Sequence, residues 1–130
     1  MALSAELQEI YRTRLTEERA RIEVERDGLE SENITLGIAQ ENKAGGAGNH
    51  IADDATDVME QERNLALIEN LQNRRRDIDH ALARLDEGTY GVCARCGKAI
   101  NPERLEALPF VTLCIDCQTL EDETPRPAAL

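Results

Sequence analysis

The stretch Cys93-Ala94-Arg95-Cys96 returns as Cys114-Ile115-Asp116-Cys117 after seventeen residues, and no other cysteine occurs in the chain. A two-residue spacer lets one tight turn direct both sulfurs of a pair toward the same point. Gly97 follows the first pair and can adopt a positive φ there at little cost. Two such pairs at this separation predict a tetrahedral zinc site. The predicted ligands are Cys93, Cys96, Cys114 and Cys117.

The predicted zinc ion is a single structural one, because four protein ligands leave no coordination position for water or substrate. Redox activity, disulfides and an iron–sulfur cluster are the alternatives. A thioredoxin-like motif would need a βαβ pattern, and none precedes Cys93. Residues 1–6 lack the basic start and apolar core of a secretory signal. We therefore expect a cytoplasmic protein, in a compartment where disulfides are rare.

Composition argues against a conventional compact core. Aromatic residues make up 2% of the chain and charged residues 32%. This balance favours helices that pack through a narrow apolar stripe, with zinc stabilising a segment too small to fold alone. The net charge is −11, and the basic run Arg74–Arg76 spreads around a helix instead of forming one patch. We expect no direct nucleic-acid binding. No apolar run approaches the roughly 20 residues of a membrane span.

Apolar residues at seven-residue spacing predict two long helices. The first covers residues 4 to about 36, with Ser4 as its N-cap. The glycine-rich stretch 37–52 is predicted to be a loop. The second helix covers residues 53 to about 86 and ends at Gly88. The residues expected to form the two stripes are Leu15, Ile22, Leu29 and Leu36 in the first helix, and Val58, Leu65, Leu71, Ile78 and Leu85 in the second.

The sequence thus predicts a mainly α protein. A long antiparallel coiled-coil hairpin over residues 1–88 precedes a four-cysteine zinc-finger module over residues 89–120 and a disordered tail over residues 121–130. Pro102 suits the first position of a short helix inside the module. The thin stripe suits an intramolecular hairpin, so we expect a monomer. The closed metal site and the absence of a cleft-forming domain argue against an enzyme.

The zinc segment resembles the DksA/TraR family of bacterial transcription regulators. The resemblance rests on linker residues as well as cysteines, in three segments: Tyr90–Gly97 (YGVCARCG), Arg104–Pro109 (RLEALP) and Leu113–Cys117 (LCIDC). It is close over about residues 53–117 and only architectural over residues 1–50. Members of that family bind RNA polymerase and not promoter DNA. The resemblance implies that the coiled coil enters the secondary channel of the polymerase, while the zinc module stays outside.

The resemblance also implies a partner-binding tip at the start of the second helix. The family pattern Asp-x-x-Asp-x-Ala places its second aspartate at Asp53 and its alanine at Ala55, with Asp54 between them. His50 occupies the place of the first aspartate, and a shifted register would use Asp54 and Asp57. The two aspartates at 53 and 54 also have a plain structural interpretation, as N-cap and first-turn acids that face the helix dipole.

Family members often act jointly with guanosine tetraphosphate, which basic residues hold. Here the corresponding positions are Asn70, Asp77 and Gln118, none of them cationic, which argues against nucleotide sensing. A structural adaptor, whose hairpin docks on another protein and never enters the polymerase, is the alternative function.

Overall fold

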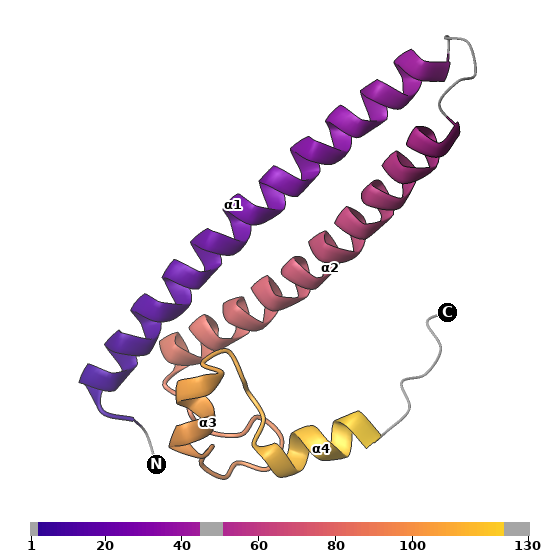
Figure 1. Cartoon of the computed structure of the whole chain (residues 1–130). Coiled ribbons are helices and arrows are strands. Elements are labelled where there is room, and N and C mark those ends of the chain that lie inside the picture. Colours follow the sequence, from indigo (N-terminus) through magenta and orange to yellow (C-terminus); the bar gives the residue numbers. More distant parts are fainter. Residues whose placement is uncertain (1–2, 45–50, 124–130) are drawn as a thin grey trace. The chain divides into compact units, whose positions relative to one another are not determined.

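The computed structural model describes residues 3–44 and 51–123, with side chains described for residues 3–39 and 55–123 (Figure 1). Within these residues the chain is mainly α, as predicted, and forms no extended strand; a single antiparallel bridge pairs Val92 with Ala99. The four helices are α1 (Ala5–Ala44), α2 (Ile51–Glu87), α3 (Pro102–Ala107) and α4 (Ile115–Glu123). Two long helices followed by a four-cysteine cluster confirm the predicted fold class.

The chain divides into two compact units that both contain parts of α1 and α2. One, which we call the cysteine unit, joins residues 1–18 to residues 76–130; the other, the hairpin unit, covers residues 19–75. We expected the whole hairpin to separate from the module at residue 88. The ends of both long helices instead belong with the cysteines. Packing explains this division, since the rings of Tyr11 in α1 and Tyr90 in the module lie 5.5 Å apart.

The seven-residue stripes form the packed side of α1 and α2 in both units. Predicted stripe residues that are buried are Leu15, Ile22, Leu71, Ile78 and Leu85. In the hairpin unit the helices run antiparallel: Arg75 Nη2 lies 3.0 Å from Glu23 Oε1, and Asn64 is bonded to Asn33. Moving from Glu23 to Asn33 along α1 therefore moves backward from Arg75 to Asn64 along α2, which is an antiparallel register.

The connection between the long helices is shorter than predicted. Residues 37–44 continue α1 and residues 51–52 begin α2, so the loop prediction is wrong for both segments. Gly37 does not end the helix. A Cβ atom at Gly37 would lie 3.4 Å from Gln61 Nε2, an ordinary van der Waals distance, so Gly37 lies beside the side chain of Gln61 in α2. Residues 45–50, which contain most of the predicted glycine-rich loop, lie outside the described residues.

The predicted stripe is wrong at the start of α2. Val58 and Leu65 are 43% and 60% exposed, whereas Asn64 is only 6% exposed and Ile68 is buried. The physical reason is the seven-residue repeat of the buried side of α2. The residue seven positions before Leu71 is Asn64 and not Leu65, so Asn64 faces the packed side although it is polar.

The prediction of a disordered tail over residues 121–130 is wrong for its first three residues. Helix α4 continues to Glu123, so residues 121–123 are helical, and residues 124–130 lie outside the described part of the chain. Among the described helices, none is both long and apolar enough to cross a bilayer.

Candidate metal centre

The first cysteine pair sits in a small hairpin turn. Val92 pairs with Ala99 in the antiparallel bridge, and the Cys93 backbone N–H donates a 2.8 Å hydrogen bond to the Lys98 carbonyl. The Gly97 N–H then donates to the Cys93 carbonyl at 3.0 Å. Gly97 has φ +76°, as its position predicted, and this left-handed conformation closes the turn at low cost.

The second pair is positioned by the start of α4. The Cys114 carbonyl accepts a 2.9 Å hydrogen bond from the Gln118 N–H, which places Cys114 at the N-terminal boundary of the helix. Cys117 follows in the first turn, and residues three apart share a helix face. The two pairs are joined by the Ala94 N–H, which donates a 2.8 Å hydrogen bond to the Thr112 carbonyl.

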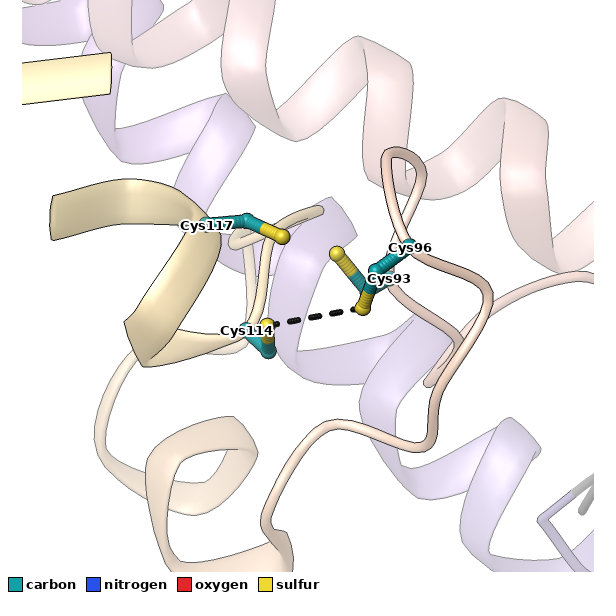
Figure 2. A group of neighbouring side chains, drawn as sticks. All are labelled: Cys93, Cys96, Cys114 and Cys117. Carbon is teal, nitrogen blue, oxygen red and sulfur yellow. Dashed lines mark hydrogen bonds between the residues drawn. The ribbon is translucent and has the colours of Figure 1, made fainter. Parts of the chain in front are cut away.

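The four predicted ligands come together, with their sulfur atoms pointing toward one another (Figure 2). All four Sγ atoms lie within 4.8 Å of one another, and none is in a disulfide. Cys96 Sγ and Cys114 Sγ, joined by the dashed line in Figure 2, lie 3.7 Å apart. A tetrahedron of thiolates with Zn–S bonds of about 2.3 Å has edges of roughly 3.8 Å. The cluster therefore fits one four-coordinate zinc ion.

Burial and hydrogen bonding act differently on the individual thiols. Burial raises the pKa of Cys93, but three backbone N–H groups donate to its sulfur and bring the pKa down to about 6; they belong to Cys114, Cys96 and Arg95. Burial, together with the neighbouring sulfurs, raises the pKa of Cys117 to about 12. A metal-free cluster at neutral pH therefore keeps a proton on Cys117, which a divalent cation would displace.

An arginine of α2 holds the first cysteine pair against the end of that helix. Arg84 Nη2 donates hydrogen bonds to the Val92 carbonyl at 2.7 Å and to the Thr89 carbonyl at 3.1 Å. The helix ends beside it, where Gly88 takes φ +78° as predicted for a C-terminal cap. Sequence reasoning missed Arg84, because nothing in the local pattern distinguishes it from the other arginines on the surface of α2.

Two further arginines bind backbone carbonyls of the linker between the two cysteine pairs. Arg104 Nε donates to the Leu113 carbonyl at 3.1 Å, and Leu113 directly precedes Cys114. Arg14 of α1 donates to the Glu106 carbonyl at 3.0 Å. Glu106 lies in the last turn of α3, where a cation complements the helix dipole. The cysteine unit thus links α1, α2 and α3 through the backbone of the module.

Tyr90 is the buried aromatic residue of the module. Its hydroxyl donates a 2.7 Å hydrogen bond to the Pro109 carbonyl, which ties the segment before the first cysteine pair to the linker between the pairs. Burial is the main reason that the pKa of Tyr90 lies well above its ordinary value. At the start of the same linker, Asn101 caps α3 by accepting a hydrogen bond from the Glu103 N–H, with Pro102 in the predicted first position.

The predicted tip residues lie at the start of α2. Asp53 and Asp54 belong to the first turn of the helix, which begins at Ile51, so neither is its N-cap; their side chains lie outside the described set. Ala55 is exposed. His50 lies outside the described residues. The role of this segment in binding a partner stays a prediction.

The positions that correspond to the nucleotide-holding residues of the family are divided between the units. Asn70 is an exposed residue of the hairpin unit, whereas Asp77 and Gln118 belong to the cysteine unit. Gln118 Nε2 donates a 3.0 Å hydrogen bond to Asp122 Oδ1 within α4.

Comparison with known proteins identifies the metal-binding segment. Residues 88–123 match the model of the prokaryotic dksA/traR C4-type zinc finger. General stress protein 16O of Bacillus subtilis is 31% identical over 132 residues, which cover 98% of this chain and 78% of that protein. The RNA polymerase-binding transcription factor DksA of Haemophilus influenzae is 40% identical over 82 residues, covering 58% of this chain and 55% of that protein.

The whole fold also has a counterpart of known structure. Transcription factor DksA2 from Pseudomonas aeruginosa superimposes with a TM-score of 0.74 at 26% identity, covering 92% of this chain and 86% of that one. The helices and the cysteine cluster define the chain as a helical hairpin protein with a C4 zinc finger. The chain belongs to the DksA/TraR family. It spans only part of some relatives: the match covers 36% of the B. subtilis protein YteA and about half of the H. influenzae protein.

Proposed function

We propose that this protein binds bacterial RNA polymerase and regulates transcription, with one structural zinc ion and without sequence-specific DNA recognition. One observation carries the proposal: a closed four-cysteine cluster is built onto the ends of two long antiparallel helices. The backbone fold of DksA2 superimposes on most of this chain, and the H. influenzae relative is named an RNA polymerase-binding transcription factor.

The zinc ion has a structural task in this proposal. Cys93, Cys96, Cys114 and Cys117 hold it and complete its coordination, so it has no open position for substrate. When bound, the ion cross-links two chain segments that the Ala94–Thr112 hydrogen bond alone would hold weakly. The protein itself supplies the remaining contacts, through Arg84 and Arg104. A closed metal site of this kind supports a role as a binding protein and not as an enzyme.

We propose further that the hairpin tip at the start of α2, with Asp53, Asp54 and Ala55, enters the secondary channel of the polymerase and acts there. Carboxylates are suited to approach a magnesium-bearing catalytic centre or the basic groups around it. The family pattern supports Asp53 and Ala55 as the positions that matter. With His50 in place of the first aspartate, we expect a regulatory effect that depends mainly on Asp53.

Charge supports the absence of direct DNA binding. The net charge is −11, and Arg75, the central residue of the one basic run, pairs with Glu23. A surface of this kind repels a phosphate backbone. Duplex DNA bound in a gel-shift assay, with an affinity that falls steeply as salt rises, would refute this part of the proposal.

The deciding experiment combines two measurements on zinc-loaded protein. Binding to RNA polymerase core enzyme is measured for the wild type, for the double variant Asp53→Asn/Ala55→Thr and for the control Glu62→Gln. Glu62 is an exposed acid further along α2, so the control also removes one negative charge. The same samples enter an in vitro transcription assay, with and without guanosine tetraphosphate.

We expect all three proteins to bind, and the double variant alone to lose its effect on transcription. Equal transcription effects of the double variant and the wild type would refute the role of the tip. No binding of zinc-loaded wild type at micromolar concentration would refute the polymerase proposal and favour the adaptor alternative. Because Asn70, Asp77 and Gln118 are not cationic, we expect the nucleotide to change the response little.

A further inference from the structure

Three side chains with amide groups form a hydrogen-bonded cluster between α1 and α2 in the hairpin unit. Asn64 Nδ2 donates a 2.9 Å hydrogen bond to Asn33 Oδ1. Asn33 Nδ2 donates to the Gln61 carbonyl, and Gln61 Nε2 donates to the Asn33 carbonyl, both at 3.3 Å. We call Asn33, Gln61 and Asn64 the amide clasp. All three hydrogen bonds join one helix to the other.

The clasp lies on the packed side between α1 and α2, which we call the seam, where the seven-residue repeat predicts apolar residues. Asn64 is 6% exposed and is the buried polar residue among the apolar core of the described chain. It stands one heptad before Leu71, and Asn33 stands four residues after Leu29 on the packed side of α1. A buried amide without a hydrogen-bond partner is costly. Sliding α2 along α1 would separate Asn64 from Asn33 and break the 2.9 Å hydrogen bond between them, leaving the buried amide of Asn64 without this partner.

The buried apolar residues of the hairpin unit are Ile22, Ile68 and Leu71, and the apolar residues on the other side of the clasp, toward the end of α1, discriminate little between registers. Leu29 and Leu36 are only partly buried, and Val58 and Leu65 are exposed. A one-residue slip moves a helix by 1.5 Å and rotates its side chains by about 100°. On the side of the clasp toward Leu36 and Val58, no apolar side chain of the described residues is fully buried to oppose such a slip. Gly37 lies beside the clasp, since a Cβ atom there would be in ordinary van der Waals contact with Gln61 Nε2, at 3.4 Å.

We propose that the amide clasp fixes the register of α1 against α2 and restricts the seam to intramolecular pairing, at a cost in stability. A single buried asparagine has this effect in coiled coils, where it specifies one register and one oligomeric state. The inference is independent of any interaction with RNA polymerase. The three residues act as positioning residues, because they determine which side chains of the two helices face each other.

The test replaces the asparagines by leucine, singly and together. Each single variant, Asn33→Leu or Asn64→Leu, leaves one amide without its partner, so its thermal midpoint falls by several degrees. The double variant Asn33→Leu/Asn64→Leu converts the seam to an apolar one, and its midpoint recovers to at least the wild-type value. Asn70→Leu is the matched control, because Asn70 is an exposed asparagine of α2 in the same unit.

Register and oligomeric state are then measured directly, because stability alone would not separate a positioning role from a structural one. Methyl NMR spectra of isoleucine-labelled protein report on Ile22 and Ile68 in the hairpin unit, with Ile100 in the cysteine unit as an internal reference. Light scattering after gel filtration reports the mass. We expect one methyl signal per isoleucine and a monomer for the wild type and for Asn70→Leu.

For the double variant we expect additional signals from Ile22 and Ile68 but not from Ile100, or a mass above that of a monomer. A double variant that keeps one signal per isoleucine and stays monomeric would overturn the proposal. So would a double variant that unfolds at a lower temperature than both single variants, since the clasp would then be a source of stability only.

Discussion

Replacing Ile78 by alanine tests whether the buried seam of the cysteine unit holds this half of the protein together. Ile78 lies in α2 and is 0% exposed, among the largest fully buried side chains of the described chain. Its core neighbours along the helix are Ala81 and Leu85, both also buried. The substitution opens a space in the packed face without adding a polar group.

The expected loss follows from the burial. Ile78→Ala removes about three methylene equivalents, worth roughly 0.8 kcal/mol each when fully buried. The cavity left behind adds to this loss, and the better helix propensity of alanine returns about 0.4 kcal/mol. We expect the free energy of unfolding to fall by about 2–4 kcal/mol. With a urea m-value of about 2 kcal/mol per molar, the unfolding midpoint would fall by roughly 1–2 M.

The assay is urea unfolding followed by circular dichroism at fixed zinc and protein concentration. Ile10→Ala is the matched control, because Ile10 belongs to α1 of the same unit but is 54% exposed. Only part of its side chain leaves an apolar environment, so the control should lose less than about 1 kcal/mol. Equal losses for the two variants, or a loss below about 1 kcal/mol for Ile78→Ala, would refute the assignment of the core.

Three further predictions concern the module. Purified protein should contain one zinc ion per chain. Chelation or Cys93→Ser should release the metal and lower the helix content measured by circular dichroism. An unchanged helix content after complete chelation would contradict a structural zinc. Zinc added to metal-free protein at pH 7 should release at least about one proton, because the pKa of Cys117 is raised to about 12. The affinity for zinc should therefore weaken as pH falls. A zinc titration in weak buffer with a pH indicator measures the proton release. Tyr90→Phe removes the hydrogen bond to the Pro109 carbonyl and should cost about 1 kcal/mol at pH 7. Since the folded pKa of Tyr90 is raised above its unfolded value of 10.0, its contribution is fully present below pH 10 and is lost as pH rises further; alkaline unfolding curves of Tyr90→Phe should lack that decline.

Much of the fold and the metal site could be predicted from local patterns. The cysteine spacing identified all four members of the cluster, and Gly97 and Gly88 adopt the positive φ values that their positions predicted. Seven-residue spacing identified two long helices and five of their buried residues. These features depend on residues close together in the chain, where geometry leaves few alternatives.

The errors arose where a local signal competed with packing between the helices. Glycine at position 37 predicts a break, yet α1 continues to Ala44 with Gly37 packed beside Gln61 of α2. The apolar pattern predicts Leu65 in the stripe, whereas the structure buries its polar neighbour Asn64 and leaves Leu65 exposed. Arg84 carried no pattern at all, since its partners are backbone carbonyls of the module.

The sequence by itself therefore determined the helices, the hairpin and the identity of the metal ligands. Only the tertiary structure decided which faces of the two helices meet, that Asn64 donates a hydrogen bond to Asn33, and which arginines bind the module. The physical reason is that helix formation and the spacing of ligands depend on neighbours along the chain. Register depends instead on a small free-energy difference between alternative pairings of distant residues, and hydrogen bonds such as those of the amide clasp decide it.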